Sequence, residues 1–505
     1  METEIDTFRH LNTDVLLQVF EHLRPDRDLR SLSMSCRWIR QESMDVLFRS
    51  CLVIVKEPLC AERFLPQSLW PYVCHLSLRD DCPDKCAMSP LRHRRHELRF
   101  TEDPLLCGTM DPRFLKTTLQ AMPRIRSLYL AFWYREIHGI GWDNLEAILS
   151  TPLLRSVTVE QFLFSPRQAP MIESIERIAP LTTFRFKHRV IRGELRDYPI
   201  QEATLGLVIG KLRHTLESLL LPSEVTPFRA LASNQWPRLR ELHLMGEIHS
   251  GPDIPIPFVT LFSGMPKLRT LKLQLALPWG IDRQILQLWP KDYEAQFPWQ
   301  ELDDLTMSFP CSEDQIYSRL PRTMQRLSLR CTPYYHFSSW RRHPLLVASA
   351  MLEILSKVDT PSLKHLELEY RADAAENDLL LCLTQKFPRL TSLEIHRFLP
   401  FGGGGLTFSD IALRVAKLKS LLTLRAYLDP GEPTEFTMLE QTAATLASKL
   451  ARPDFKLWLL RMNGSSGRWY PFCLAAEQNT DQEARAEIDL SNNKGKGIAA
   501  SLFEE

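Results

Sequence analysis

A short pattern of apolar and polar positions recurs along most of this chain. With Φ for an apolar residue and x for any residue, the pattern is P-x-Φ-x-x-Φ-x-Φ. Seven segments match it in full: PYVCHLSL from Pro71, PRIRSLYL from Pro123, PLLRSVTV from Pro152, PRLRELHL from Pro237, PKLRTLKL from Pro266, PSLKHLEL from Pro361 and PRLTSLEI from Pro388. Five more keep the apolar positions without the proline, beginning at Leu181, Leu216, Leu302, Met324 and Leu421. Alternation predicts a short strand in each segment, with its last two apolar residues inward.

The spacing of these segments predicts a repeat architecture. With the middle apolar residue of each unit as a marker, from Leu128 to Leu424, successive separations are 29, 27, 35, 23, 29, 34, 22, 39, 27 and 31 residues. Segments with helical spacing, such as HPLLVASAMLEILSKV and DIALRVAKLKSL, lie between them. We therefore expect an α/β fold, a curved leucine-rich-repeat-like solenoid with parallel strands on its concave face. The alternative is a generic α/β domain. The wide gap from Leu76 to Leu128 indicates an insertion or an unrecognised unit.

A helical pattern occupies residues 11–49. A first helix carries an apolar stripe behind an N-cap at Asn12 or Thr13, and the segment RPDRD ends it. A second helix follows, and SMDVLFRS supplies a third short element. Three short helices bury little surface by themselves, so they need a partner: the solenoid, another chain, or both. Periodicity alone does not choose between these partners.

The order and spacing of these residues resemble an F-box motif, in the form common in fungal proteins. The family pattern is roughly Leu-Pro-x-Glu-Leu-Leu-x-x-Ile-Phe-x-x-Leu, then Asp-Leu, then Cys-Arg, and later Leu-Phe-Arg. This chain matches it at Leu11, Leu16, Leu17, Phe20, Leu23, Asp28, Leu29, Leu32, Cys36, Arg37, Leu47, Phe48 and Arg49. It departs at Asn12, where the family usually has proline, and at Ile39, where a bulky aromatic residue is common. An F-box ahead of leucine-rich repeats is a familiar pairing.

The resemblance implies a role in ubiquitin transfer. An F-box protein of this type is the substrate adaptor of a Skp–cullin–F-box ubiquitin ligase, and it has no catalytic residue and no cofactor. The resemblance implies that a Skp-type adaptor, and through it a cullin, binds a surface formed by Leu11, Val15, Leu16, Val19, Phe20, Leu23, Leu29, Leu32, Cys36, Ile39 and Leu47. The repeats would hold an unknown target protein. The alternatives are an interaction scaffold that forms no active ligase and, more distantly, an enzyme built on the repeats.

The outward positions of the predicted strands are where we expect the target to bind. The candidates lie in the C-terminal repeats and are Arg326, Arg330, Glu367, Glu369, Glu394, His396, Arg425 and Tyr427. Register predicts that the three glutamates form an acidic spot, with the first two arginines one repeat earlier. The face of a solvated sheet is polar by default, so a polar composition alone does not establish binding.

Composition narrows the class of protein. The 505 residues, 44% of them hydrophobic, are too many for one ordinary compact domain unless the architecture is elongated. A formal net charge of +1 points to neither nucleic acid nor an anionic membrane. Eleven scattered cysteines favour reduced thiols in the cytosol or nucleus. The chain opens without a signal-peptide pattern, and its apolar runs fall short of the roughly 18–20 residues of a membrane span. We expect a soluble protein of the cytoplasm, the nucleus or both.

Two further motifs carry little specific chemistry. CPDKCAMSPLRHRRH contains Cys82, Cys86, His93 and His96, but the spacing is tighter than that of zinc fingers, so we expect a polar loop and no metal site. FGGGGLTFSD, residues 401–410, has the glycines of a phosphate-binding loop without its Gly-Lys-Ser/Thr, so we expect a flexible turn. Neither G-x-S-x-G nor H-E-x-x-H occurs, and we expect no enzyme activity.

These patterns divide the chain into four parts. We expect an F-box helical domain over residues 1–50, a linker over 51–70, an irregular repeat solenoid over 71–475 and a polar tail over 476–505. The tail has the composition of a largely disordered segment. Just before it, LWLLRMNGSSGRWYPFCL predicts a closing hairpin with its turn at NGSSG.

Overall fold

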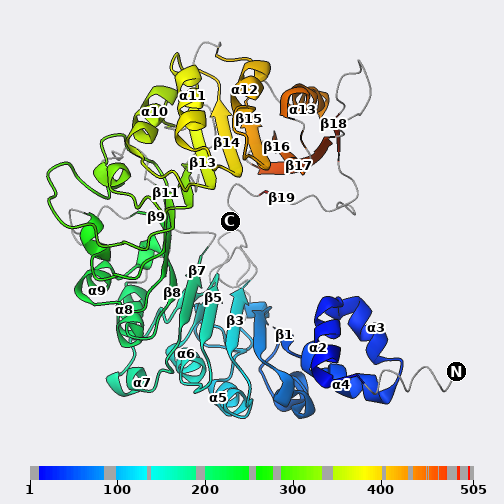
Figure 1. Cartoon of the computed structure of the whole chain (residues 1–505). Coiled ribbons are helices and arrows are strands. Elements are labelled where there is room, and N and C mark those ends of the chain that lie inside the picture. Colours follow the sequence, from blue (N-terminus) through cyan, green and yellow to red (C-terminus); the bar gives the residue numbers. More distant parts are fainter. Residues whose placement is uncertain are drawn as a thin grey trace. The chain divides into compact units, whose positions relative to one another are not determined.

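The chain folds into two units, which are described separately (Figure 1). The first comprises Met1–Leu219 and Val225–Pro227, and the second comprises Leu220–Glu224 and Phe228–Glu505. The computed structural model describes residues 11–84, 98–132, 138–188, 199–248, 258–276, 286–331, 345–400, 405–429, 431, 436–450, 452, 454–463, 466–474, 486–488 and 499–500.

The first unit begins with helices where the sequence predicts them, although the predicted second helix is divided in two and SMDVL belongs to the last helix. They are α2 (Thr13–His22), a helical turn (Pro25–Leu29), α3 (Arg30–Ser33) and α4 (Arg37–Leu47). Asn12 is the N-cap of α2, and its side chain accepts a hydrogen bond of 3.0 Å from the N–H of Asp14. The residue that replaces the family's proline therefore satisfies a free helix N–H group.

A parallel sheet follows in the first unit. Its strands are β1 (Ser50–Val55), β2 (His75–Asp80), β3 (Ser127–Phe132), β5 (Ser156–Glu160) and β7 (Thr183–Lys187). The marker residues pair in register from Leu76 through Leu128 and Val157 to Phe184. Because β2 pairs directly with β3, the gap between their markers is an insertion. Strand β1, paired with β2, lies in the segment expected to be a linker.

Helices alternate with these strands. They are α5 (Pro112–Gln120), α6 (Trp142–Leu149), α7 (Ile172–Glu176) and α8 (Ile200–Leu212). A separate pair of short parallel strands is formed by β4 (Gly139–Ile140) and β6 (Leu163–Phe164). Shorter helical turns cover Ala61–Arg63 and Gln67–Tyr72. Strand β8 (Ser218–Pro222) lies where the two units divide.

The second unit repeats the same plan. Its parallel strands are β9 (Glu241–Glu247), β10 (Thr270–Ala276), β11 (Asp304–Met307), β12 (Arg326–Leu329), β13 (His365–Arg371), β14 (Ser392–Phe398), β15 (Thr423–Leu428) and β16 (Lys456–Asn463). Its helices are α9 (Phe228–Ser233), α10 (Ala348–Lys357), α11 (Glu376–Lys386), α12 (Phe408–Val415) and α13 (Phe436–Leu450), with turns at Ser223–Val225, Phe258–Phe262 and Gln315–Ser318. The markers pair in register from Leu242 to Leu424.

The sheet ends in the predicted hairpin. Strand β17 (Ser466–Leu474) runs antiparallel to β16, which confirms the reversal at NGSSG. Two short strands, β18 (Ala486–Ile488) and β19 (Ala499–Ala500), pair with β17. They lie in the segment expected to be a disordered tail, whose other residues are outside those that the structure describes.

The apolar frame explains the core of both units. The first apolar residue of the frame, such as Ile125 or Leu268, is buried, and so are the two that follow it on the strand. The helices α10, α11 and α12 lie side by side along one face of the second unit's sheet (Figure 1). The inward residues pack beneath such helices, and the alternate residues of each strand point to the opposite face. The chain is therefore a mixed α/β protein with a large, mostly parallel sheet of many strands.

Candidate functional site

The N-terminal helices have a small apolar core of their own. Leu16 and Phe20 of α2 and Leu29 are buried in it. Six partly buried side chains pack against these three: Leu23, Leu32, Trp38, Ile39, Val46 and Leu47. Most of the residues that the sequence assigns to adaptor binding therefore lie in this core or against it, where they hold the helices together.

A second apolar face of α2 is exposed. Val15 and Val19 expose 45% and 43% of their surface, and Leu11, just before the helix, exposes 40%. The spacing of four residues places the two valines on the same side of the helix. Met34, at the end of α3, is 62% exposed. Several large apolar side chains exposed together are typical of a surface that another protein covers.

Ion pairs and a sulfur cap fix the helices within the first unit. Arg49 pairs with Glu21 of α2 at 2.8 Å, and Arg124, just before β3, pairs with Asp45 of α4 at 2.5 Å. Cys36 is partly buried, and its sulfur accepts the N–H of Ile39 at the start of α4. This cysteine of the F-box-like pattern therefore contributes to the helix start.

The predicted target-binding residues centre on Glu394 of β14. Its carboxylate is 4% exposed and lies 2.8 Å from Arg330 Nη1, 3.0 Å from Arg425 Nη1 and 2.8 Å from His396 Nε2. Arg330 also lies 3.7 Å from the carboxylate of Glu367. Two of the three glutamates expected to form an acidic spot, Glu367 and Glu394, are thus part of an ion-pair network with arginines.

The network controls the charge of Glu394. Burial by itself would raise the pKa of this carboxyl group. The charge of Arg330, with smaller contributions from His396 and Arg425, outweighs burial and lowers the pKa to about 2. Glu394 is therefore ionised throughout the physiological pH range, and its charge is balanced inside the protein.

Five of the eight predicted target-binding residues are buried, and three of these five do not line the hollow on the polar face that is described below. Glu369 is fully buried, and its carboxylate accepts the N–H of Cys331 at 2.7 Å. His396 and Tyr427 are also buried, beside Trp469 of β17. These three side chains stabilise the sheet, and we do not place them on the binding face.

Trp469 is a neighbour of this network that sequence reasoning missed. The guanidinium carbon of Arg425 lies 4.3 Å from the centre of the Trp469 ring. The only sign of this contact in the sequence was the predicted hairpin. Its second strand contains GRWYPF and runs back along β16, which brings Trp469 to the edge of the ladder. The aromatic ring covers one side of Arg425 and so helps to orient its charge toward Glu394.

The other five predicted residues meet at a hollow of about 240 Å³ on the polar face of the second unit. Its lining comes from β10 to β15 and comprises Lys272, Gln274, Asp304, Thr306, Arg326, Leu327, Ser328, Arg330, His365, Leu366, Glu367, Ser392, Glu394 and Arg425. Arg326, Arg330, Glu367, Glu394 and Arg425 are thus brought together, as the strand register predicts. A concave polar site of this kind suits a charged or amide-bearing side chain of a target protein.

Two titratable groups in the hollow have shifted pKa values. Burial raises the pKa of Asp304, and the nearby charges of Lys272 and Arg326 only partly oppose this effect. Burial also lowers the pKa of His365, with Arg326 and Lys364 acting in the same direction, so the imidazole is neutral at neutral pH.

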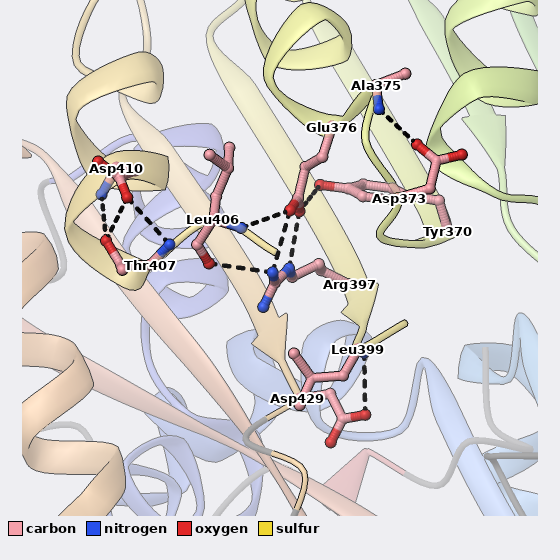
Figure 2. A network of polar contacts seen from close by, with 10 residues as sticks. All are labelled: Tyr370, Asp373, Ala375, Glu376, Arg397, Leu399, Leu406, Thr407, Asp410 and Asp429. Atoms are coloured by element: carbon pink, nitrogen blue, oxygen red, sulfur yellow. Dashed lines mark hydrogen bonds and ion pairs between the residues drawn. The ribbon is translucent and has the colours of Figure 1, made fainter. Parts of the chain in front are cut away.

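A second buried ion pair explains part of the glycine-rich segment (Figure 2). Arg397 of β14 donates from Nε to Oε1 of Glu376 at 2.8 Å and from Nη2 to Oε2 at 3.1 Å. Leu406 joins them, because its N–H donates to Glu376 and its carbonyl oxygen accepts from Arg397. Gly405 has a φ of +105°, and a Cβ atom there would lie 2.6 Å from Arg397 Nη2. This glycine therefore serves local packing, while residues 401–404 lie outside the described residues.

The structure also gathers three side chains that no sequence motif joins. Cys82, Cys107 and His138 are buried together in the first unit. Of the cysteine–histidine motif weighed in the sequence, Cys82 is part of this cluster, and Cys86, His93 and His96 lie outside the described residues.

The fold and these surfaces define a class of protein, a mixed α/β protein of repeated strand and helix units with N-terminal helices. Among the described residues, no helix is long and apolar enough to span a membrane. No protein-family model matches the chain, and no curated protein is similar to it in sequence. The chain resembles a chain in the crystal structure of the Rad7 and Elc1 complex in yeast, with 14% identity and a TM-score of 0.41 over 90% of this chain and 95% of that one. A likeness at this level carries no argument about function.

Proposed function

We propose that this chain is the substrate-recognition adaptor of a Skp–cullin–F-box ubiquitin ligase. In this proposal the helices of residues 11–49 dock on a Skp-type adaptor, which connects the chain to a cullin. The polar face of the second unit binds the target protein. The chain contributes no catalytic residue, and it acts by raising the effective concentration of the target near the ubiquitin-charged enzyme.

The observation that carries the proposal is that α2 has two apolar faces. One face, with Leu16 and Phe20, is buried in the core of the N-terminal helices. The other, with Val15 and Val19, stays exposed although the helices already have a core. A helix that only stabilised the chain would present a polar face to water. The second face therefore supports docking on another protein, which is the use that the F-box resemblance implies.

The hollow supports the second half of the proposal. Its lining carries both signs of charge, with Lys272 and Arg326 beside Asp304 and Glu367. These side chains come from neighbouring strands of a rigid parallel ladder, so their positions are fixed before a target binds. A preformed site of mixed charge gives specificity through complementary ion pairs and hydrogen bonds.

The first experiment tests docking through the exposed face alone. The full chain is co-expressed with a Skp-type adaptor and purified through a tag, as wild type and as Val15→Asp/Val19→Asp. We expect the double variant to lose the adaptor while keeping its thermal stability, because both valines are exposed. Substitution of the buried Leu16 or Phe20 would also unfold the helices and would not separate the two effects.

The matched control is Leu413→Asp in α12, which removes an apolar residue of similar exposure, 49%, from another helix. It should retain the adaptor. If the wild type fails to bind any Skp-type adaptor, or if the double variant binds as well as the wild type, the docking proposal is wrong.

A second experiment separates the ligase adaptor from the scaffold that forms no active ligase. Cullin should be recovered with the wild-type chain through the Skp-type adaptor, and a protein bound by the second unit should accumulate when residues 11–49 are deleted. Recovery of the Skp-type adaptor without cullin, and without any accumulating protein, would favour the scaffold.

A further inference from the structure

The buried cluster in the first unit has the composition of a metal site. One ligand atom from each of Cys82, Cys107 and His138 lies within 4.8 Å of the others. None of the three side chains exposes more than 5% of its surface. Two thiols and one imidazole are the ligand types that zinc prefers in proteins.

Backbone contacts hold two of these residues side by side. The N–H of Cys107 donates to the carbonyl of Gly139 at 2.8 Å, and the N–H of Gly139 donates to that of Leu105 at 2.7 Å. A Cβ atom on Gly139 would lie 2.8 Å from the oxygen of Leu105, and one on Gly108 would lie 2.0 Å from that of Phe100. A side chain at either glycine would clash with one of these backbone oxygen atoms. The two glycines therefore permit the close approach of the backbone that places Cys107 beside His138.

Asp80 orients the other two residues. Its Oδ1 atom accepts the N–H of Cys82 at 2.8 Å, and its Oδ2 atom lies 2.6 Å from Nδ1 of His138. The second ring nitrogen of His138, Nε2, is buried, no donor or acceptor among the described residues meets it in hydrogen-bond geometry, and the side chain of Cys82 also interacts with the ring. In zinc sites, a histidine usually binds the metal through one ring nitrogen and donates the N–H of the other to a carboxylate. Asp80 and His138 have this arrangement.

We propose that Cys82, Cys107 and His138 bind a zinc ion, with Asp80 as the residue that orients the histidine. Bond lengths of about 2.3 Å to sulfur and 2.0 Å to nitrogen place the ligand atoms of a tetrahedral site about 3.5–3.8 Å apart. In this proposal, small side-chain rotations bring the ligand atoms, which lie within 4.8 Å of one another, to that spacing. In this proposal a water molecule is the fourth ligand.

Two other readings of the cluster are a reactive thiol and a disulfide. A catalytic cysteine must reach its substrate, and the burial of both thiols excludes that use. Both cysteines are free thiols in this structure.

The experiment measures metal on the full chain. We expect about one zinc per chain by elemental analysis after purification without added metal, and loss of most of that zinc in Cys107→Ser and in His138→Ala. Cys51→Ser, which changes a partly buried cysteine of the same unit outside the cluster, should keep it. Asp80→Asn should keep the site but weaken its affinity about 10–100-fold in a chelator competition.

A spectroscopic measurement on the wild type tests the site without relying on variants that fold poorly. X-ray absorption at the zinc edge of the wild type should show two sulfur neighbours and lighter atoms in the remaining positions. Cobalt substituted for zinc should show thiolate charge-transfer bands. The proposal is wrong if the wild-type protein contains no stoichiometric metal. It is also wrong if Cys82 and Cys107 resist alkylation until a reductant is added, because that result indicates a disulfide. The proposed ligase function rests on other residues, so the two proposals fail independently.

Discussion

The ion-pair network around Glu394 makes a quantitative prediction about the stability of the second unit. The substitution Glu394→Gln keeps the size of the side chain and removes its charge. The side chain of Arg330, which is 9% exposed, then keeps Glu367 at 3.7 Å as a weaker ion-pair partner among the described residues. Breaking a buried ion pair by removing one partner is strongly destabilising, because the remaining charge stays buried.

The magnitude follows from the pKa of Glu394. Its value falls from 4.5 to about 2 because Arg330, His396 and Arg425 outweigh burial. The difference of roughly 2.5 pH units corresponds to about 3 kcal/mol of stability. Since the folded pKa lies below the unfolded one, this contribution is complete above about pH 5 and is lost as the pH falls toward 2. Glu394→Gln should therefore cost about 3 kcal/mol at pH 7 and much less at pH 3.

The assay is urea unfolding at pH 7, 5 and 3, followed by pulsed hydrogen exchange in peptides from β12 to β15. Reading only these peptides separates the second unit from the first, since a chain with two units does not unfold in one step. Glu367→Gln is the matched control, because Glu367 is 35% exposed and its loss should cost less than about 1 kcal/mol. The reasoning is refuted if Glu394→Gln costs no more free energy of unfolding at pH 7 than Glu367→Gln. It is also refuted if the cost of Glu394→Gln is the same at pH 7 and pH 3.

Two further predictions concern the helices and the glycines. Leu16→Ala should lower the free energy of unfolding of residues 11–49 by about 2–5 kcal/mol. Val15→Ala should change it by less than about 0.5 kcal/mol, as measured by hydrogen exchange, and equal losses would contradict the assignment of two faces. Gly405→Ala should cost about 1 kcal/mol or more, because its φ is +105° and Arg397 is close, and it should speed protease cleavage around residue 405. Gly210→Ala, in α8 with no atom within 4 Å of the added Cβ, should instead be neutral or stabilising.

Much of the fold follows from the apolar frame in the sequence. Each frame buries one residue before its strand and two within it, and these markers pair in register from Leu242 to Leu424. The hairpin at NGSSG also formed where its turn residues predict it. The strand β1 was missed because SCLVIV lacks the proline and the spacing of the frame, so that only its pairing with β2 reveals it.

The candidate site was predictable in position but not in detail. Strand register placed Arg330, Glu367 and Glu394 together, since parallel strands with aligned markers also align the residues between them. Register does not reveal which of those residues are covered. His396 is buried beside Trp469 of the last hairpin, and Glu369 is buried where its carboxylate accepts the N–H of Cys331. The sequence of a strand contains no information on such neighbours.

The proposed zinc site lies where the repeat pattern is interrupted. Because Leu76 pairs directly with Leu128, the segment between β2 and α5 is additional to the usual length of one repeat. It must be held by contacts of its own, such as the carboxylate of Asp84, which accepts the N–H groups of Arg99 and Phe100. A metal bound by Cys82 and Cys107 would tie both ends of this insertion to His138, beyond β3. Such a link would add to the burial of Leu105 and Met110, which already anchors the described part of the insertion.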